Sequence, residues 1–203
     1  MTKKLLIAFS TLMEAALTIE KLSFTPQKET GLYSNDKATI VITGIGPYAA
    51  FHSIDSLIAD YDEILNIGIA GSLSLDIHPF EIHEIGTVSK FSFYPGGKEN
   101  TSLYHSEQLL KPIEINHKPI KLITTDFTLT CTSLRKVLSY DHNLVDMEGY
   151  AIAHLCKTKQ KKCRMIKLVS DTCDKNTSAI IKKNLHKYSE SLFEFLSKSF
   201  ELK

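Results

Sequence analysis

The stretch ATIVITGIGPYAA, residues 38–50, indicates which kind of fold this chain adopts. It begins with a continuous apolar and β-branched run, Ala38–Thr43, that suits a strand buried on both faces. Glycine and proline break this run at 44–47, and a helical pattern follows over 48–59. A strand that turns directly into a helix is the repeating unit of α/β proteins. The stretch therefore predicts an α/β fold.

The same alternation of short apolar runs and helical patterns continues along the chain. Further strands are expected at 4–9, 63–69, 86–93, 119–124 and 165–169. Helices are expected at 13–22, 135–138, 147–156 and 179–200, the last one amphipathic and interrupted near Lys187. The glycine-, proline- and polar-rich segment 94–109 is typical of a mobile loop over a site. The sequence has no repeat and no linker, which predicts a single domain over 1–203.

Composition and charge exclude several classes of protein. The 24 Lys and Arg residues nearly balance 23 Asp and Glu, so the basic excess of a nucleic-acid-binding protein is missing. No apolar run approaches the roughly 20 residues of a membrane helix, and the apolar run after Met1–Lys4 is broken by Ser10, Thr11 and Glu14. We interpret this start as a first strand, not an export signal. The four cysteines show no metal or disulfide spacing, so we expect reduced thiols in the cytoplasm and no metal.

The glycine turn after the strand at 38–43 allows two interpretations. Gly44 and Gly46 match a dinucleotide-binding turn, and the acidic residues at 60, 62 and 63 follow it at a plausible sequence spacing for a ribose-binding acid. A Rossmann-type oxidoreductase is therefore one alternative. Tight strand-to-helix turns need glycine for backbone reasons alone, however. A second glycine turn, Gly68–Gly71, ends the next strand, and two such strand ends side by side would form a shallow cradle for a small flat ligand.

Three carboxylates lie where an α/β sheet builds its site. Asp171 directly follows the strand at 165–169, Glu148 falls in the first turn of the helix at 147–156, and Glu14 comes just past the first strand. Taken singly, each has an ordinary structural explanation: a turn or cap residue, a complement to the helix dipole, and a solvated helix carboxylate. Their common location at strand ends predicts a site there.

Four blocks of sequence carry a resemblance to a known family. They are TGIG at 43–46, NIGIAGSL at 66–73, DMEGYAIA at 146–153 and the Ser170-Asp171 pair. In this order they resemble the nucleoside phosphorylase superfamily, and within it the methylthioadenosine/S-adenosylhomocysteine nucleosidases and the futalosine hydrolases. The resemblance implies a three-layer α/β/α sandwich with a twisted, mixed central sheet, a homodimer, a nucleoside substrate and no cofactor.

The resemblance also implies roles for individual residues. Asp171 would protonate purine N7 so that the base leaves uncharged, Glu148 would bind the ribose hydroxyls and stabilise the developing positive charge, and Glu14 would activate water. Phe127 would stack on the purine, although a buried core position is equally common for Phe. The remaining implied substrate contacts are Met147, Ile45, Ala70, Gly71 and Ser170.

The nucleophile and the substrate are two further expectations. The chain has only two arginines, Arg135 and Arg164, and neither neighbours Gly44 or Gly71 in sequence, which favours water over phosphate. A lysine could still bind phosphate as a point charge, which leaves a phosphorolytic enzyme as an alternative. The start STLMEA at 10–15 is similar to futalosine hydrolases and implies futalosine or aminofutalosine, in a menaquinone pathway, ahead of methylthioadenosine. In this start, Glu14 is displaced from the position that the water-activating Glu usually has in the nucleosidases. A catalytically idle relative is therefore another alternative.

Overall fold

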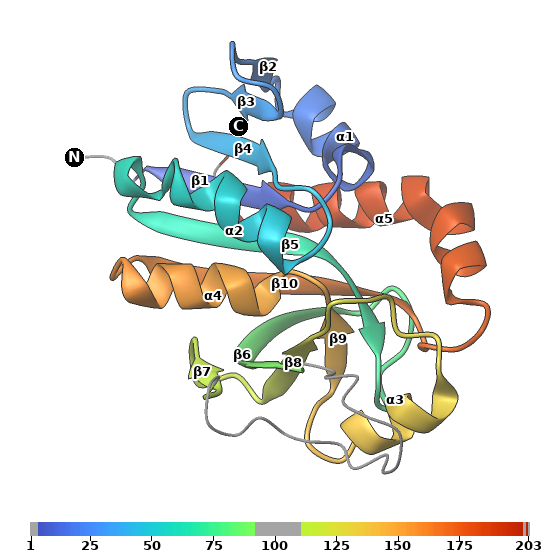
Figure 1. The fold of residues 1–203 in the computed structure, drawn as a ribbon. Helices are drawn as coiled ribbons and strands as arrows, with labels where there is room; N and C mark the ends of the chain where they lie inside the picture. Colours follow the sequence, from blue (N-terminus) through green and yellow to red (C-terminus); the bar gives the residue numbers. More distant parts are fainter. Residues whose placement is uncertain (1–3, 92–110, 201, 203) are drawn as a thin grey trace.

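The computed structural model describes residues 4–91, 111–200 and 202, which form a ten-stranded mixed sheet with helices on both faces (Figure 1). The strands are β1 Leu5–Phe9, β2 Thr25–Pro26, β3 Leu32–Ser34, β4 Ala38–Ile42, β5 Glu63–Ser72, β6 Ile82–Lys90, β7 Ile113–Glu114, β8 Ile120–Thr124, β9 Leu144–Asp146 and β10 Lys162–Asp171. The helices are α1 Leu12–Lys21, α2 Pro47–Asp55, α3 Thr132–Leu138, α4 Gly149–Thr158 and α5 Thr177–Ser199, with a short 3-10 turn at Ile58–Asp60.

The sheet follows the order β10-β6-β8-β9-β5-β1-β4-β3-β2, with β7 paired to β6. Strand β10 also pairs with β5 in parallel, so β10, β6, β8, β9 and β5 form a closed circuit. Strands β4, β1, β5 and β10 run parallel to one another, and their carboxyl ends therefore meet at one edge of the sheet.

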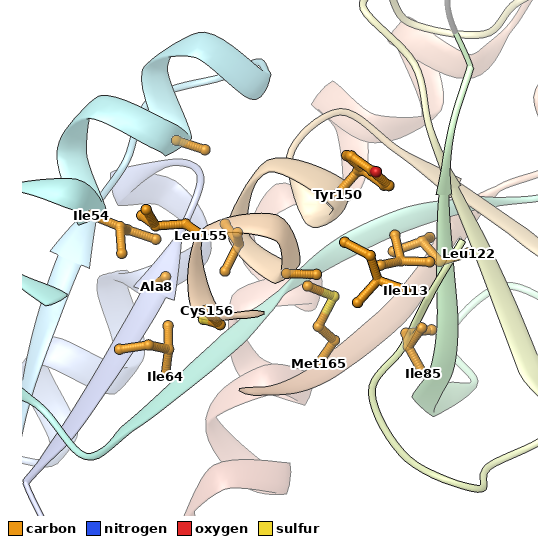
Figure 2. Packing of buried hydrophobic residues seen from close by; sticks show 14 of the residues in the cluster. Ala8, Ile54, Ile64, Ile85, Ile113, Leu122, Tyr150, Leu155, Cys156 and Met165 are labelled. Carbon is orange, nitrogen blue, oxygen red and sulfur yellow. The ribbon is translucent and has the colours of Figure 1, made fainter. Parts of the chain in front are cut away.

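Two layers of apolar side chains fill the space between the sheet and its helices. In β1, Leu6 and Ala8 belong to the cluster under α2 and α4, whereas Ile7 and Phe9 belong to the cluster under α1 and α5. This division follows from the two-residue period of a strand. Figure 2 shows the first cluster, in which Leu155 of α4 packs among side chains of the sheet. The expected three-layer α/β/α sandwich with a mixed sheet is confirmed.

The sequence patterns located most elements but missed several boundaries. Strands β5 and β10 extend to Ser72 and Asp171, and the short strands β2, β3, β7 and β9 have no clear pattern of their own. The helical pattern at 48–59 ends at Asp55. The expected loop at 94–109 lies outside the described residues.

Two helix predictions were wrong in detail. Helix α4 begins at Gly149, so Met147 and Glu148 precede it, and its buried face contains Ile152 and Leu155. Helix α5 continues through Lys187 without interruption, because no glycine or proline occurs between its ends.

The two glycine turns do not lie side by side as predicted. Strand β1 pairs with both β4 and β5, so it separates the turn after β4 from the end of β5. The sequence pattern could not show this, because the order of strands in a sheet differs from their order along the chain. Within the described part of the chain, no helix is long and apolar enough to cross a membrane.

Candidate active site

A cavity of about 420 Å³ opens at the edge where the parallel strands end. Its lining includes residues from the β1–α1 connection, the β4–α2 turn, the ends of β5 and β10, and the segments that follow β8 and β9. All nine residues proposed from the sequence line this one cavity: Glu14, Ile45, Ala70, Gly71, Phe127, Met147, Glu148, Ser170 and Asp171. The fold thus brings together residues that are up to 157 positions apart (171 − 14).

Asp171 is buried at the end of β10 and accepts three hydrogen bonds. Cys173 N and Thr177 Oγ1 each donate to its Oδ1 over 2.8 Å, and Ser170 Oγ lies 2.6 Å from its Oδ2. Ser170 Oγ also lies 3.2 Å from the carbonyl oxygen of Ala70. The hydroxyl can donate to either group, so it can accept a hydrogen bond from a protonated Asp171 Oδ2 while it donates to the Ala70 carbonyl oxygen. The arrangement accommodates both protonation states of Asp171.

Glu148 lies just before α4, where its carboxylate reaches across to another element instead of capping its own helix. The Gly46 N–H donates to Glu148 Oε1 over 2.7 Å, which ties the β4–α2 turn to the segment after β9. Burial raises the pKa of Glu148 to about 7, and the Asp146 carboxylate adds to this rise. Lys167 and the Gly46 N–H lower the pKa of Glu148, whereas the Glu14 carboxylate raises it further. Glu148 therefore changes its charge near neutral pH.

Glu14 is 1% exposed, so its interpretation as a solvated carboxylate is wrong. Its Oε2 accepts hydrogen bonds from Ser10 Oγ at 2.5 Å, Thr11 Oγ1 at 2.8 Å and Thr11 N at 2.9 Å. These contacts include the capping box of α1. Its Oε1 accepts from Ile69 N at 3.0 Å. A Cβ on Gly68 would lie only 3.0 Å from this Oε1. Glycine at position 68 therefore provides the space that the Glu14 carboxylate occupies.

Sequence reasoning missed Lys167, which stands 2% exposed in the middle of β10. Its Nζ lies 2.8 Å from Asp146 Oδ2, and Asp146 also accepts hydrogen bonds from Thr124 Oγ1 and Gly149 N. A lysine inside the otherwise apolar run Met165–Val169 was the signal that could have revealed this pair, because a buried ammonium requires a counter-charge.

The charge of Lys167 depends on the carboxylates around it. Burial alone would lower its pKa, but Asp146, Glu148 and Glu14 more than offset that effect, so the pKa of Lys167 is raised. Lys167 therefore remains an ammonium group behind the cavity, where it balances part of the negative charge of the site.

Phe127 and Met147 form an apolar part of the cavity lining. The Phe127 side chain is 37% exposed and meets Phe91 edge-to-face with ring centroids 6.4 Å apart, so it is not a buried core residue. Thr128 Oγ1 lies 3.7 Å from the Met147 sulfur, which brings the segment after β8 against the segment after β9. A flat ring could lie against Phe127 within this cavity.

The two arginines do not line the cavity. Arg135 Nη1 donates to the carbonyl oxygen of Thr172 over 2.8 Å. Arg164 pairs with Glu84 and lies over the Phe200 ring. Among the lining residues within the described ranges, Lys182 is the single lysine or arginine. The described side chains contain no group of three or more His, Cys, Asp or Glu that could hold a metal ion.

Comparison with known proteins identifies the architecture. A family model described as the phosphorylase superfamily matches residues 104–201. A futalosine hydrolase mutant of Helicobacter pylori strain 26695 is 16% identical with a TM-score of 0.81, and the match covers 96% of this chain and 97% of that chain. The chain has the nucleoside phosphorylase fold. The resemblance seen in the sequence is thereby confirmed.

Two nucleosidases share this nucleoside phosphorylase fold. A mutant of the Helicobacter pylori 5′-methylthioadenosine/S-adenosylhomocysteine nucleosidase, with 5′-methylthioadenosine in its active site, is 17% identical with a TM-score of 0.83 and 98% coverage of both chains. A nucleosidase from Chlamydia trachomatis bound to the same nucleoside is 21% identical with a TM-score of 0.71, over 95% of this chain and 94% of that chain. The likeness at these identities concerns the fold.

The Rossmann alternative does not agree with this structure. The Gly46 N–H, which would face a pyrophosphate, donates to Glu148 instead. Asp62 and Glu63, two of the acids at a plausible spacing for a ribose, lie at the opposite edge of the sheet, where they contact Lys4 N and Lys162 Nζ. The pattern of two glycines reflects the backbone of a tight turn: Gly46 has a φ of 97°, which only glycine adopts readily.

Proposed function

We propose that this protein is a hydrolase that cleaves the N-glycosidic bond of a purine nucleoside and releases the free base. The observation that carries this proposal is the meeting of three buried carboxylates, Asp171, Glu148 and Glu14, on one cavity that also exposes Phe127. Each carboxylate has different hydrogen-bond partners, which suits three different roles.

Asp171 is the proposed general acid. The bond between ribose C1′ and purine N9 breaks, and its electron pair goes to the base. A proton from Asp171 reaches N7, so the base leaves as a neutral molecule. Ser170 Oγ, 2.6 Å from Asp171 Oδ2, orients the carboxyl group in either protonation state. The buried position of Asp171 keeps bulk water from competing for that proton.

Glu148 and Glu14 are proposed to act on the sugar side of the bond. Glu148 in its ionised form accepts hydrogen bonds from the ribose hydroxyls and stabilises the oxocarbenium-like transition state. Glu14 orients the water that adds to C1′ and accepts its proton. Because Glu14 Oε2 is held by Ser10 and Thr11, Oε1 is the oxygen better placed to serve this water.

Water is the proposed nucleophile because the lining that the structure describes contains no arginine to bind phosphate. Tight recognition of phosphate commonly uses the bidentate fork of arginine, and both arginines are engaged elsewhere. The carboxylates at the reacting end of the cavity would also repel a phosphate dianion.

Futalosine or aminofutalosine is the preferred substrate, and methylthioadenosine or S-adenosylhomocysteine is the alternative. The similarity of the start around Glu14 to futalosine hydrolases supports this order, and structures of both kinds of enzyme share the fold. We further propose a single domain, a homodimer, a cytoplasmic location and a place in menaquinone biosynthesis.

A substrate panel tests the proposed function. Purified protein is incubated with futalosine, aminofutalosine, methylthioadenosine and inosine, and the released base is measured by chromatography. Release of hypoxanthine or adenine, abolished in the Asp171→Asn variant, is the expected result. A folded protein that releases no base from any of the four would contradict the proposal and favour a catalytically idle relative.

A further inference from the structure

We propose that Cys156 and Cys163 form a site of reversible oxidation, at which a small-molecule disulfide such as oxidised glutathione converts the two thiols into one intramolecular disulfide. Cys156 lies near the end of α4, and Cys163 lies at the start of β10. Neither residue lines the cavity at the carboxyl ends of the strands. The site therefore belongs to a different part of the molecule, and it does not depend on the proposed function.

Both thiols face the layer between the sheet and α4. Side chains at every second position of a strand point to the same face, so Cys163 shares its face of β10 with Met165. Met165 and Cys156 are buried in one apolar cluster, and Cys163 packs against that cluster. Cys163 is also paired in register with Ile64 of β5, and Figure 2 shows Ile64 and Cys156 in the same part of the cluster. Helix and strand thus bring the two cysteines together.

A short connection between α4 and β10 fixes the positions of the two cysteines relative to each other. Only residues 159–161 separate the helix from the strand. Lys161 N donates to the carbonyl oxygen of Cys156 over 2.8 Å, and Gln160 has a left-handed φ of 54°. The chain therefore reverses its direction within this connection, which returns Cys163 to the end of α4 that carries Cys156.

The Cys156 and Cys163 side chains contact each other directly. The Cys163 thiol is hydrogen bonded to Cys156, and this bond together with burial raises the pKa of Cys163 well above the usual value of a thiol. A disulfide requires the two sulfur atoms to approach to about 2.05 Å, and the contact leaves a short distance to close. The other two cysteines lie elsewhere: Cys131 is exposed before α3, and Cys173 contacts Asp171. All four cysteines are free thiols.

A second cavity, of about 520 Å³, gives a small-molecule oxidant access to the pair. Both cysteines line it, and Cys163 is half-buried whereas Cys156 is buried, so the oxidant reaches Cys163 first. An excess of positive charge on the described lining favours an anionic oxidant, and oxidised glutathione is anionic. The charged residues of this lining are Lys157, Lys161, Lys162 and Arg164 against Glu84 and Glu114.

The oxidation consists of two thiol–disulfide exchanges. Cys163 loses its proton to solvent, and its thiolate attacks one sulfur of oxidised glutathione. The glutathione disulfide bond breaks, a mixed disulfide forms on Cys163, and one glutathione leaves as a thiolate that takes up a proton. The Cys156 thiolate then attacks the Cys163 sulfur and releases the second glutathione in the same way. Two protein thiols are oxidised to one disulfide, and one glutathione disulfide is reduced to two thiols.

The disulfide should stabilise the fold without acting on the reacting groups. Cys156 follows Glu148 by eight residues (156 − 148), and Cys163 precedes Asp171 by eight (171 − 163). At the rise of a helix and of a strand, the bond would lie about 12 Å along α4 and about 26 Å along β10 from these two carboxylates. It would close a short loop and reduce the conformational freedom of the unfolded chain. Thermal stability is therefore the property that oxidation should change.

Equilibration with glutathione tests the proposal. Wild-type protein, Cys163→Ser and the matched control Cys131→Ser are incubated with reduced or with oxidised glutathione. Remaining thiols are alkylated in denaturant, and disulfides are mapped by peptide mass spectrometry. In oxidised glutathione, the wild type and Cys131→Ser should both link Cys156 to Cys163, and dithiothreitol should reverse the link. Their melting temperatures should rise by about 5 °C on oxidation, whereas that of Cys163→Ser should not.

Several outcomes would overturn the proposal. In one, the folded wild type keeps both thiols open to alkylation after equilibration with oxidised glutathione. In another, glutathione stays attached to Cys163 without a link to Cys156, or the mapped disulfide contains Cys131 or Cys173. A link without a rise in melting temperature would overturn its stabilising role. If Cys163→Ser does not fold, Cys156→Ala removes the other member of the pair and replaces it in the same comparison.

Discussion

At the scale of single residues, the site depends on how each carboxylate is hydrogen bonded. Asp171 accepts three hydrogen bonds, Glu14 accepts four, and Glu148 accepts one from the backbone. The pKa of Glu148 rises to about 7 because the group is buried near Asp146 with little to stabilise its charge.

Replacing Asp171 by Asn should remove the proposed general acid and leave the fold intact. The amide can still accept from Cys173 N and Thr177 Oγ1, so folding loses little. We expect base release to fall by about 10²–10⁴-fold, the usual contribution of general acid catalysis. Single-turnover rates measure the effect, and circular dichroism checks the fold. Turnover close to wild type in the folded variant would show that another group protonates the base.

Glu148 should make both activity and stability depend on pH near neutrality. kcat/KM should rise with pH through about 7 as Glu148 ionises, and Glu148→Gln should lower the plateau and remove this rise. Because the pKa is raised above its usual 4.5, the folded state binds a proton that the unfolded state has released. Stability from Glu148 is therefore lost as the pH rises from about 4.5 to 7.

Urea unfolding at several pH values tests the stability part of this prediction. The wild-type free energy of unfolding should fall between pH 4.5 and 7 relative to that of Glu148→Gln, by at most about 3 kcal/mol from the size of the pKa rise. If the difference between the two proteins were constant over this range, Glu148 would not have a raised pKa in the folded state.

At the scale of secondary-structure elements, two long-range contacts hold the strand ends around the cavity. The Lys167–Asp146 pair connects β10 to β9, and the Gly46–Glu148 hydrogen bond connects the β4–α2 turn to the start of α4. Both contacts are buried, so the loss of one partner leaves a polar group without compensation.

Replacing Lys167 by Met should destabilise the protein by about 3–5 kcal/mol, because Asp146 would remain buried without its counter-charge. The double variant Lys167→Met with Asp146→Asn is the matched control. It removes both charges and should recover much of the lost free energy of unfolding. A double variant as unstable as Lys167→Met alone would show that packing, and not the unpaired charge, causes the loss.

Replacing Gly46 by Ala should cost about 1–3 kcal/mol of stability through backbone strain. Gly46 has φ 97° and ψ 158°, a region reserved for glycine, and a Cβ there would meet no atom within 4 Å. The cost therefore comes from the backbone and not from a clash. If the turn relaxes to relieve the strain, the N–H leaves Glu148 and base release falls. Urea unfolding and base release are measured on the same Gly46→Ala protein, and we expect a lower free energy of unfolding, slower base release, or both. No change in either quantity would show that the backbone at position 46 is not strained by alanine.

At the scale of the whole molecule, the positions of the two arginines favour water over phosphate as the proposed nucleophile. Because both arginines lie away from the cavity, inorganic phosphate should neither accelerate the reaction nor produce ribose 1-phosphate. In ¹⁸O-labelled water, mass spectrometry should find the label on the released sugar. Ribose 1-phosphate as the main product would replace the hydrolase by a phosphorylase.

The sequence by itself determined the fold class, the position of most elements and nine of the residues that line the cavity. These follow from hydrophobic periods and from short motifs, which depend on neighbours along the chain. Predictions failed where no local pattern exists. The strand β9 has only three residues, and β1 inserts between β4 and β5 because of sheet pairing.

Only the tertiary structure decided what surrounds each site residue. Glu14 meets Ile69, Gly46 meets Glu148, and Lys167 meets Asp146 across separations of 55, 102 and 21 residues (167 − 146). Burial and charge in these contacts set the pKa of Glu148 and the state of Lys167. The pairing of distant segments depends on sheet register and on helix packing. Sheet register and helix packing cannot be predicted from the sequence pattern of a single segment, because both result from all segments burying their apolar faces together.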